Sequence, residues 1–305
     1  MVQSHLPSRK PLLNPYQKTD INIKKDIKAF IDDYSNAYVL KNENIVCDGY
    51  SMVQSQINGM KYLLNRCLKW DFFINLSDQD FPLKSQDFIL DFLNMNKGKN
   101  FIKIVNQIME RPSTPNRVEN YFQEIDIGFS GIPYKRSFMK NVTSYVGGQW
   151  MILTRACCEF ICESPEVKKF EDFYHKILIA DESFFQTALM NTSFKETIIN
   201  DDKRVVIWIA DGDIKLKPKT LTGSDIDFLM QGDNLFAREF DVNIDALVLD
   251  FLEESIKINP ILNNSINIDF NLVPTLNMDT KKGAVLSPET ITNPPTQLRK
   301  LNGNK

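Results

Sequence analysis

The sequence contains few of the residues that build metal centres, disulfide frameworks or nucleic-acid surfaces. Its 305 residues include only two histidines, His5 and His175, and no pair of CxxC motifs, so a zinc site of the usual spacing is excluded. The five cysteines are an odd number, and three of them crowd into residues 157–162, unlike a secreted disulfide scaffold. With 36 Lys+Arg against 39 Asp+Glu, the net charge of -3 argues against nucleic acid as a main partner.

Long apolar runs are also missing. No stretch of about 18 uninterrupted apolar residues occurs, and no charged segment followed by an apolar one opens the chain, so we expect no membrane span and no secretion signal here. This leaves open an intracellular protein, peripheral membrane association, or an anchor outside this chain. The motifs GxGxxG, GxxxxGK[ST], GxSxG and HExxH are absent, which removes motif support for Rossmann dehydrogenase, P-loop nucleotidase and zinc-protease functions.

What the sequence does contain is an alternation of strands and helices in a chain that is 43% hydrophobic. The hydrophobic spacing predicts helices over residues 23–34, 51–68, 86–95, 155–162, 167–176, 182–190, 224–230 and 244–256. Short apolar runs predict strands over residues 37–40, 70–76, 101–105, 149–153 and 204–209. This order predicts an α/β fold with a mostly parallel central sheet flanked by helices, and with ligands at the carboxyl ends of the strands.

The domain boundaries follow from composition. We expect one domain over residues 1–258 and an irregular tail over residues 259–305, where Pro, Thr, Asn and Lys become frequent. Residues 110–140 hold several prolines and glycines with weak periodicity, and are predicted to form a long loop that carries function.

Two carboxylates follow the predicted strand over residues 70–76. Asp78 and Asp80, two residues apart at a strand end, are able to hold Mg²⁺ or Mn²⁺ against a diphosphate. A solvated turn in which an aspartate caps the next helix is the equally weighted structural interpretation.

Other polar and aromatic residues also have both a structural and a functional interpretation. Glu182 lies at a predicted helix start opened by Asp181, where capping is the commoner role. Trp150 and Trp208 belong to strand-like segments, so a core role is the default and stacking on a sugar is the functional alternative. The cations Lys217, Lys219 and Arg238 are either solvated or placed to stabilise a departing phosphate.

Nine segments, taken in order, resemble the core-2/I-branching N-acetylglucosaminyltransferase and peptide O-xylosyltransferase family. They are YSNAYV (34–39), GYSMVQ (49–54), WDFFINLSDQDFPLK (70–84), KNFIKI (99–104), GGQWMILTR (147–155), DESFFQTAL (181–189), RVVIW (204–208), KPKTLTGSD (217–225) and LFAREFD (235–241). The resemblance covers roughly residues 5–254. WDFFINLS and ESFFQT are somewhat closer to the xylosyltransferase branch.

The resemblance implies a GT-A type fold and an inverting, metal-independent transfer. The donor it implies is UDP-GlcNAc or UDP-xylose, no cofactor is required, and the acceptor is a hydroxyl of a glycan or protein. The family's general base corresponds to Glu182, which takes the proton of the attacking hydroxyl. The resemblance further implies donor-binding roles for Lys217, Lys219, Arg238 and Asp80, and acceptor-binding roles for Trp208, Trp150 and Arg117.

Several positions depart from the family pattern, all of them in the donor half. Glu239 occupies the position of a family lysine, and Arg238 beside it is expected to point to the opposite face of an extended strand. Pro7 stands where the family has an aspartate, and Cys47 where it has a tryptophan. The family's first strand and helix are also expected to be missing from this chain.

Three functions therefore remain as alternatives from the sequence. The first is an active inverting transferase with Glu182 as base. The second is a non-catalytic family member that binds a glycan or a protein partner, and the third is a metal-dependent transferase using Asp78 and Asp80. A bacterial member is expected in the cytoplasm or at the membrane in polysaccharide synthesis, and a fragment of a eukaryotic member at the Golgi membrane.

Overall fold

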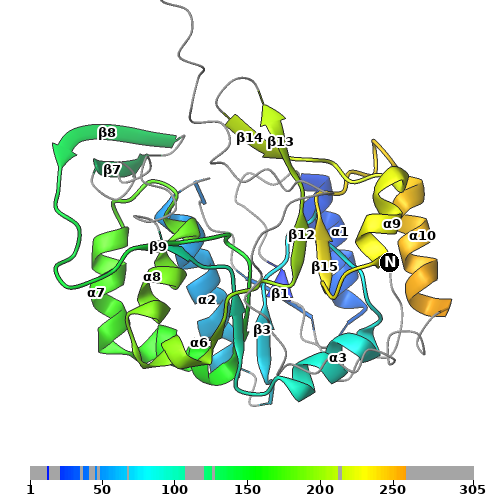
Figure 1. The fold of residues 1–305 in the computed structure, drawn as a ribbon, viewed down its shortest axis with the longest axis horizontal. Coiled ribbons are helices and arrows are strands. Elements are labelled where there is room, and N and C mark those ends of the chain that lie inside the picture. Colours follow the sequence, from blue (N-terminus) through cyan, green and yellow to red (C-terminus); the bar gives the residue numbers. More distant parts are fainter. Residues whose placement is uncertain are drawn as a thin grey trace, which may run out of the picture. The chain divides into compact units, whose positions relative to one another are not determined.

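The protein folds into two compact units in the computed structural model (Figure 1). The structure describes residues 12–13, 21–34, 37–40, 45–46, 49–66, 69–106, 120–125, 128–211 and 215–258. The first unit comprises Met1–Leu76 and Phe92–Asp202, and the second comprises Ser77–Asp91 and Lys203–Lys305. The chain passes from the second unit back to the first within helix α3 (Gln86–Met95).

A four-stranded sheet organises the first unit. Its strand order is β11 (Ile198–Ile199), β5 (Asn100–Ile102), β10 (Met151–Thr154) and β3 (Phe72–Ile74). Strand β10 pairs antiparallel with both β3 and β5, and β11 pairs parallel with β5. The helices of this unit are α1 (Ile21–Asp32), α2 (Tyr50–Arg66), α6 (Arg155–Glu163), α7 (Pro165–Tyr174) and α8 (Phe184–Met190).

Local chemistry explains why α6 and α7 begin where they do. Thr154 ends β10 and caps α6, because its side chain accepts a hydrogen bond from Cys157 N at 3.2 Å. Ser164 caps α7 in the same way. Pro165 occupies the first helical position, where a backbone N–H would have no acceptor within the helix. The thiols of Cys157 and Cys158 are free and fully buried in the core of this unit.

Short strands complete the first unit. Strand β7 (Asn120–Ile125) pairs antiparallel with β8 (Gly128–Lys135), and β6 (Val105–Asn106) with β9 (Tyr145–Val146). Strands β1 (Leu12–Leu13) and β2 (Tyr38–Val39) pair in parallel. The predicted loop over residues 110–140 is therefore wrong for residues 120–125 and 128–135, which form paired strands, and residues 110–119 lie outside the described residues. The sequence did not predict β8 because it contains glycine and proline, which are uncommon inside strands.

The second unit has a smaller sheet and a separate hairpin. Strand β15 (Phe236–Arg238) lies between β12 (Arg204–Val206), its parallel neighbour, and β4 (Phe81–Pro82), its antiparallel one. Strands β13 (Trp208–Asp211) and β14 (Lys215–Pro218) form the hairpin. Its helices are α9 (Ile226–Met230) and α10 (Ala246–Ile258), which bury Leu229 and Leu252 against Leu83 and Leu221.

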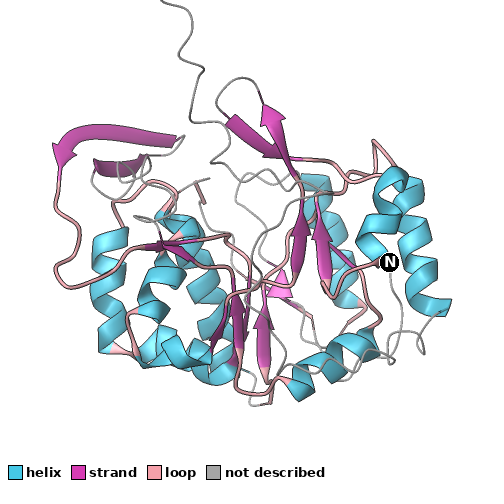
Figure 2. Cartoon of the chain, in the orientation of Figure 1, coloured by secondary structure: helices cyan, strands magenta, loops and turns pink. Residues whose placement is uncertain are grey.

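The α/β class expected from the sequence is confirmed, because helices alternate with strands in both units (Figure 2). The prediction of a mostly parallel sheet is wrong: the two described sheets with more than two strands are both mixed, and β10 is antiparallel to its two neighbours. A strand covered on both faces reads as a continuous apolar run in either direction, so the sequence pattern did not reveal the strand direction. The expected tail over residues 259–305 lies outside the described residues.

Candidate active site

Glu182 lies at the end of a short 3₁₀ turn in the first unit. The turn η1 (Ala180–Glu182) follows Ile179, whose left-handed backbone has a φ of 56°. Helix α8 begins two residues later, at Phe184, so the prediction of a helix starting at Glu182 is wrong. Asp181 is buried, whereas Glu182 is partly exposed. The role of Glu182 as general base stays a prediction.

The glycine pair before β10 fixes the backbone of Glu182. Gly147 N donates a hydrogen bond to the Glu182 carbonyl oxygen at 2.8 Å, and the Gln186 side-chain amide donates to the Gly148 carbonyl at 2.7 Å. A Cβ atom on Gly147 would lie 1.9 Å from the carbonyl oxygen of Lys103. Only glycine therefore allows this close approach, which holds the Glu182 turn against the loop.

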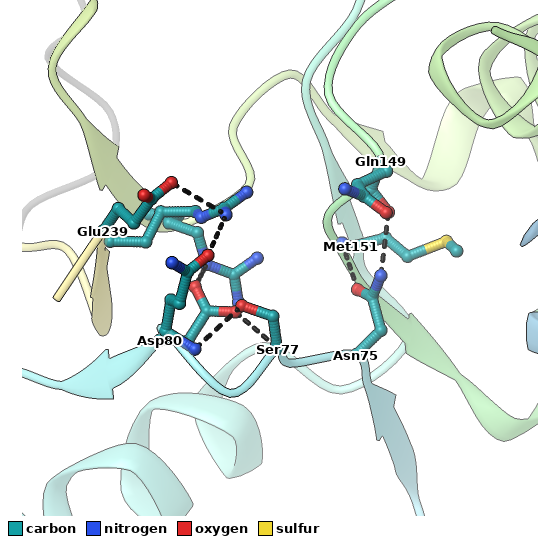
Figure 3. A network of polar contacts seen from close by, with 9 residues as sticks. Asn75, Ser77, Asp80, Gln149, Met151 and Glu239 are labelled. Carbon is teal, nitrogen blue, oxygen red and sulfur yellow. Dashed lines mark hydrogen bonds and ion pairs between the residues drawn. The ribbon is translucent and has the colours of Figure 1, made fainter. Parts of the chain in front are cut away.

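The other end of this loop is held by an asparagine that sequence reasoning missed. The Asn75 amide donates to the Gln149 carbonyl at 2.8 Å and accepts from Met151 N at 2.8 Å (Figure 3). Trp150, between these two contacts, is buried, with 7% of its surface exposed. Its acceptor-binding role stays a prediction.

In the second unit, Asp80 forms a buried ion pair with Arg204. Asp80 Oδ1 lies 3.1 Å from Arg204 Nε, and the two side chains are 0% and 1% exposed. Asp80 Oδ2 also accepts a hydrogen bond from Ser77 N at 2.5 Å, which closes the turn after residue 76 (Figure 3). The ion pair gives Asp80 a structural partner, and its donor-binding role and the alternative metal-binding role stay predictions. Asp78 is exposed, and the described residues contain no cluster of three His, Cys, Asp or Glu placed for a metal ion.

Arg238 contacts a carboxylate and an amide. Its Nη2 atom lies 3.5 Å from Glu239 Oε2 and 3.4 Å from Gln79 Oε1 (Figure 3). The expectation that Arg238 and Glu239 point to opposite faces is wrong, because β15 ends at Arg238 and the alternation of a strand does not continue beyond it. The positive charge of Arg238 is thus partly neutralised by its neighbour.

The two predicted donor-binding lysines also form ion pairs. Lys217 Nζ lies 3.2 Å from Asp211 Oδ1 across the β13–β14 hairpin, with both side chains about half exposed. Lys219 Nζ contacts Asp225 Oδ1, and Asp225 also forms a capping box with Thr222. Burial alone would raise the pKa of Asp225, but hydrogen bonds from Lys219 and from Thr222 N outweigh it and lower the pKa. Asp225 is consequently a stable counterion for Lys219.

Trp208 is the exposed aromatic residue among the predicted acceptor ligands. It begins β13, is 49% exposed, and lies opposite Pro218 of β14. Its accessible ring is suited to stacking, and its role stays a prediction. Arg117, Pro7 and Cys47 lie outside the described residues.

The chain matches the core-2/I-branching enzyme family over residues 18–229. It is 29% identical over 246 residues to xylosyltransferase 2 of Rattus norvegicus, covering 75% of this chain and 28% of that protein. It is 27% identical over 248 residues to xylosyltransferase 2 of Homo sapiens, covering 76% and 29%. Xylosyltransferase 1 of Rattus norvegicus is 27% identical over 190 residues, which cover 61% and 23%. The chain thus spans under a third of the length of the curated relatives it matches.

The family match covers more than half of the chain, so it shows the family to which the chain belongs. The chain belongs to the core-2/I-branching enzyme family, as its nine motifs indicated. Its architecture is consistent with the GT-A type of that family. Among the described residues, no helix has the length and apolar character needed to cross a membrane.

Proposed function

We propose that this chain transfers a sugar from a UDP-sugar donor to a hydroxyl of a glycan or protein, with inversion and without a metal ion. The observation that carries the proposal is the family match over residues 18–229, which includes Glu182 on its fixed turn. Since the relatives compared above carry the name xylosyltransferase, UDP-xylose is the first donor to test and UDP-GlcNAc the second.

The reaction requires one general base. The acceptor oxygen forms a bond to the anomeric carbon from the face opposite the diphosphate, while the bond from that carbon to the phosphate oxygen breaks. The acceptor proton moves to the Glu182 carboxylate, and the bonding electron pair leaves with UDP. A fixed backbone helps because a base that is held in place does not have to be ordered when the substrates bind.

Charge on the leaving diphosphate must be balanced by the protein. Lys217, Lys219 and Arg238 remain the proposed cations, each already near a carboxylate. Partly exposed ion pairs of this kind contribute about 0–1 kcal/mol, so a diphosphate is able to displace the carboxylate partner. Trp208 is the proposed stacking residue for the acceptor, with 49% of its surface exposed.

The same ion pairs favour a second candidate, a non-catalytic member that binds a glycan or a protein partner. Arg238 contacts Glu239, and Glu239 stands where the resembled family has a lysine. A site whose cations are neutralised by the protein's own carboxylates attracts a diphosphate less strongly. This candidate predicts that neither UDP nor a UDP-sugar binds at millimolar concentration.

One experiment separates the two candidates. UDP release is measured with UDP-xylose, UDP-GlcNAc and UDP-galactose, with and without EDTA, for the natural chain and for Glu182→Gln. The proposal expects release that persists in EDTA and is lost in Glu182→Gln, while UDP binding by calorimetry is unchanged. Glu196→Gln, in the 3₁₀ turn η2 (Ser193–Thr197) of the same unit, serves as a matched control. Turnover that survives Glu182→Gln would contradict the assignment of the base.

A further inference from the structure

A row of hydrogen bonds joins helix α8 to the segment over residues 143–148, within the first unit. This segment contains β9, whose sheet partner among the described residues is β6. The free edge of a two-stranded sheet leaves backbone N–H and C=O groups that need other partners. Here the side chains of α8 and of its C-cap residue bond to the backbone of the segment. The helix therefore takes the place of a third strand.

Thr187 supplies the central contact of this row. Its hydroxyl oxygen accepts a hydrogen bond from Tyr145 N at 3.0 Å and donates to the Tyr145 carbonyl at 3.0 Å. The buried Tyr174 hydroxyl donates to the same oxygen at 3.0 Å. A threonine hydroxyl has one donor and two acceptor positions, so all of them are in use. Thr187 is 0% exposed, so bulk water cannot replace any of these bonds.

Asn191 forms the same kind of contact one helical turn later, at the end of α8. Its side-chain oxygen accepts from Thr143 N at 3.0 Å, and its side-chain amide donates to the Thr143 carbonyl at 2.8 Å. The amide also donates to the Thr187 carbonyl at 2.8 Å, which connects it to its own helix. Thr187 and Asn191 therefore each hold both the N–H and the C=O of one backbone residue.

The row of hydrogen bonds ends at the turn that carries Glu182. Gly147 N donates to the Glu182 carbonyl at 2.8 Å, and the buried Gln186 amide donates to the Gly148 carbonyl at 2.7 Å. The backbone of Glu182 is thus bonded to the same segment that α8 holds. We call these contacts with residues 143–148 the α8 ladder, and they come from Asn191, Thr187, Gln186 and Glu182.

The spacing of α8 matches the spacing of the segment. Thr187 and Asn191 are four residues apart in the sequence, about 6.0 Å along a helix axis. Their partners Tyr145 and Thr143 are two residues apart, about 6.6–6.8 Å along a strand. One helical turn therefore corresponds to two strand residues, and the next N–H in this series is that of Gly147. A shift of the segment by one residue would turn all of these N–H groups to its other side.

We propose that the α8 ladder, with Thr187 at its centre, positions Glu182. The ladder fixes the register of the segment, and Gly147 then fixes the backbone that carries the Glu182 side chain. Since α8 has only seven residues and helices shorter than about 12–15 residues are marginal in water, contacts of this kind decide where the turn lies. Thr187, Asn191 and Gln186 are positioning residues, because they act through the backbone of Glu182. The effect on turnover rests on the proposed function, in which Glu182 is the base.

The test compares Thr187→Val, which keeps the shape of the side chain but removes the hydroxyl, with Thr187→Ser, which keeps the hydroxyl. Amide hydrogen exchange at Gly147, followed by NMR, reports the bond to Glu182 directly. Amides within α6 serve as the reference, because unfolding of the whole unit speeds exchange at both places. We expect Thr187→Val to speed exchange at Gly147 about tenfold relative to α6, the effect of leaving buried polar groups without partners. Thr187→Ser should restore slow exchange.

A second variant and a matched control keep the test decisive if Thr187→Val does not fold. Asn191→Ala removes the contact at the partly exposed end of the ladder and should speed exchange at Gly147 about threefold relative to α6. Thr192→Val removes a hydroxyl that bonds only to the Leu189 carbonyl of its own helix, at 3.0 Å. This control should leave the ratio of the two exchange rates unchanged.

The same variants are assayed for UDP release with the donor that the natural chain uses. The assay is run well below the melting temperature of each variant, so that loss of folded protein does not contribute. A displaced base slows the chemical step without removing a donor contact. We therefore expect Thr187→Val to lower kcat about tenfold with an unchanged KM for the donor, Thr187→Ser to restore kcat, and Thr192→Val to have no effect.

The outcomes separate the ladder from the transfer reaction. If Thr187→Val and Asn191→Ala leave exchange at Gly147 unchanged relative to α6, the ladder does not hold the Glu182 turn and the proposal is overturned. Faster exchange together with an unchanged kcat in an active enzyme overturns the positioning role. If exchange becomes faster while the natural chain releases no UDP from any donor, the hold on the Glu182 turn is confirmed and the transfer reaction alone is refuted.

Discussion

The buried ion pair between Asp80 and Arg204 gives the sharpest prediction for the second unit. Replacing Asp80 with asparagine keeps the shape of the side chain and an oxygen that accepts from Ser77 N, but removes the charge that Arg204 faces at 3.1 Å. Since both side chains are at most 1% exposed, water cannot replace the lost partner. The variant therefore leaves an arginine buried without its counterion.

The expected loss is large. At an effective dielectric constant of about 20, two unit charges 3.1 Å apart attract by about 5 kcal/mol. Measured losses from breaking one side of a buried pair are about 3–5 kcal/mol, which corresponds to a fall in melting temperature of about 6–20 °C at 2–4 °C per kcal/mol. The control Asp211→Asn breaks the half-exposed pair with Lys217 and should cost at most about 1 kcal/mol.

Urea and thermal unfolding followed by circular dichroism measure both variants. The double variant Asp80→Leu with Arg204→Met should recover most of the loss, because a buried pair replaced by apolar groups of similar size is often tolerated. If Asp80→Asn destabilises the protein no more than Asp211→Asn does, the structural role of Asp80 is refuted.

Three further predictions concern the donor cations, the Glu182 turn and the histidine. Glu239→Gln removes the carboxylate near Arg238, so UDP should bind about threefold to tenfold more tightly by calorimetry, and weaker binding would contradict this. Gly147→Ala places a Cβ against the carbonyl of Lys103, so turnover should fall together with stability, and an unaffected melting temperature would argue against the contact. Because burial lowers the pKa of His175, the unfolded chain binds its proton first, so its contribution to stability should decline as pH falls below about 6.5. A titration midpoint for His175 above that pH, by NMR, would refute this sign.

The sequence predicted the elements better than the contacts between them. Helix α3 begins and ends at the predicted residues, because Ser85 provides the cap that its pattern indicates. The strand predicted over residues 204–209 divides into β12 and β13, which belong to different sheets. An apolar run shows that a segment is extended, but not which partner each part of it takes.

For the site residues, too, the sequence predicted identities better than contacts. The resemblance to the family identified Glu182, but the 3₁₀ turn that carries it depends on Ile179 in a left-handed conformation, which a β-branched residue rarely adopts. The ion pair of Asp80 joins positions more than a hundred residues apart in the sequence. The only sequence signal for it is Arg204 at the start of an apolar strand, since a buried cation needs a partner of opposite charge. Such pairings depend on the fold and not on local spacing.

Two buried cysteines at the start of α6 make the local opening of this helix measurable. Cys157 and Cys158 follow the Thr154 cap directly, and burial raises the pKa of both thiols, so neither is ionised in the closed protein. A thiol reacts as its thiolate, so a water-soluble thiol reagent reaches these cysteines only when the segment separates from the core. The modification rate at these two positions therefore reports how often α6 separates from the core under native conditions.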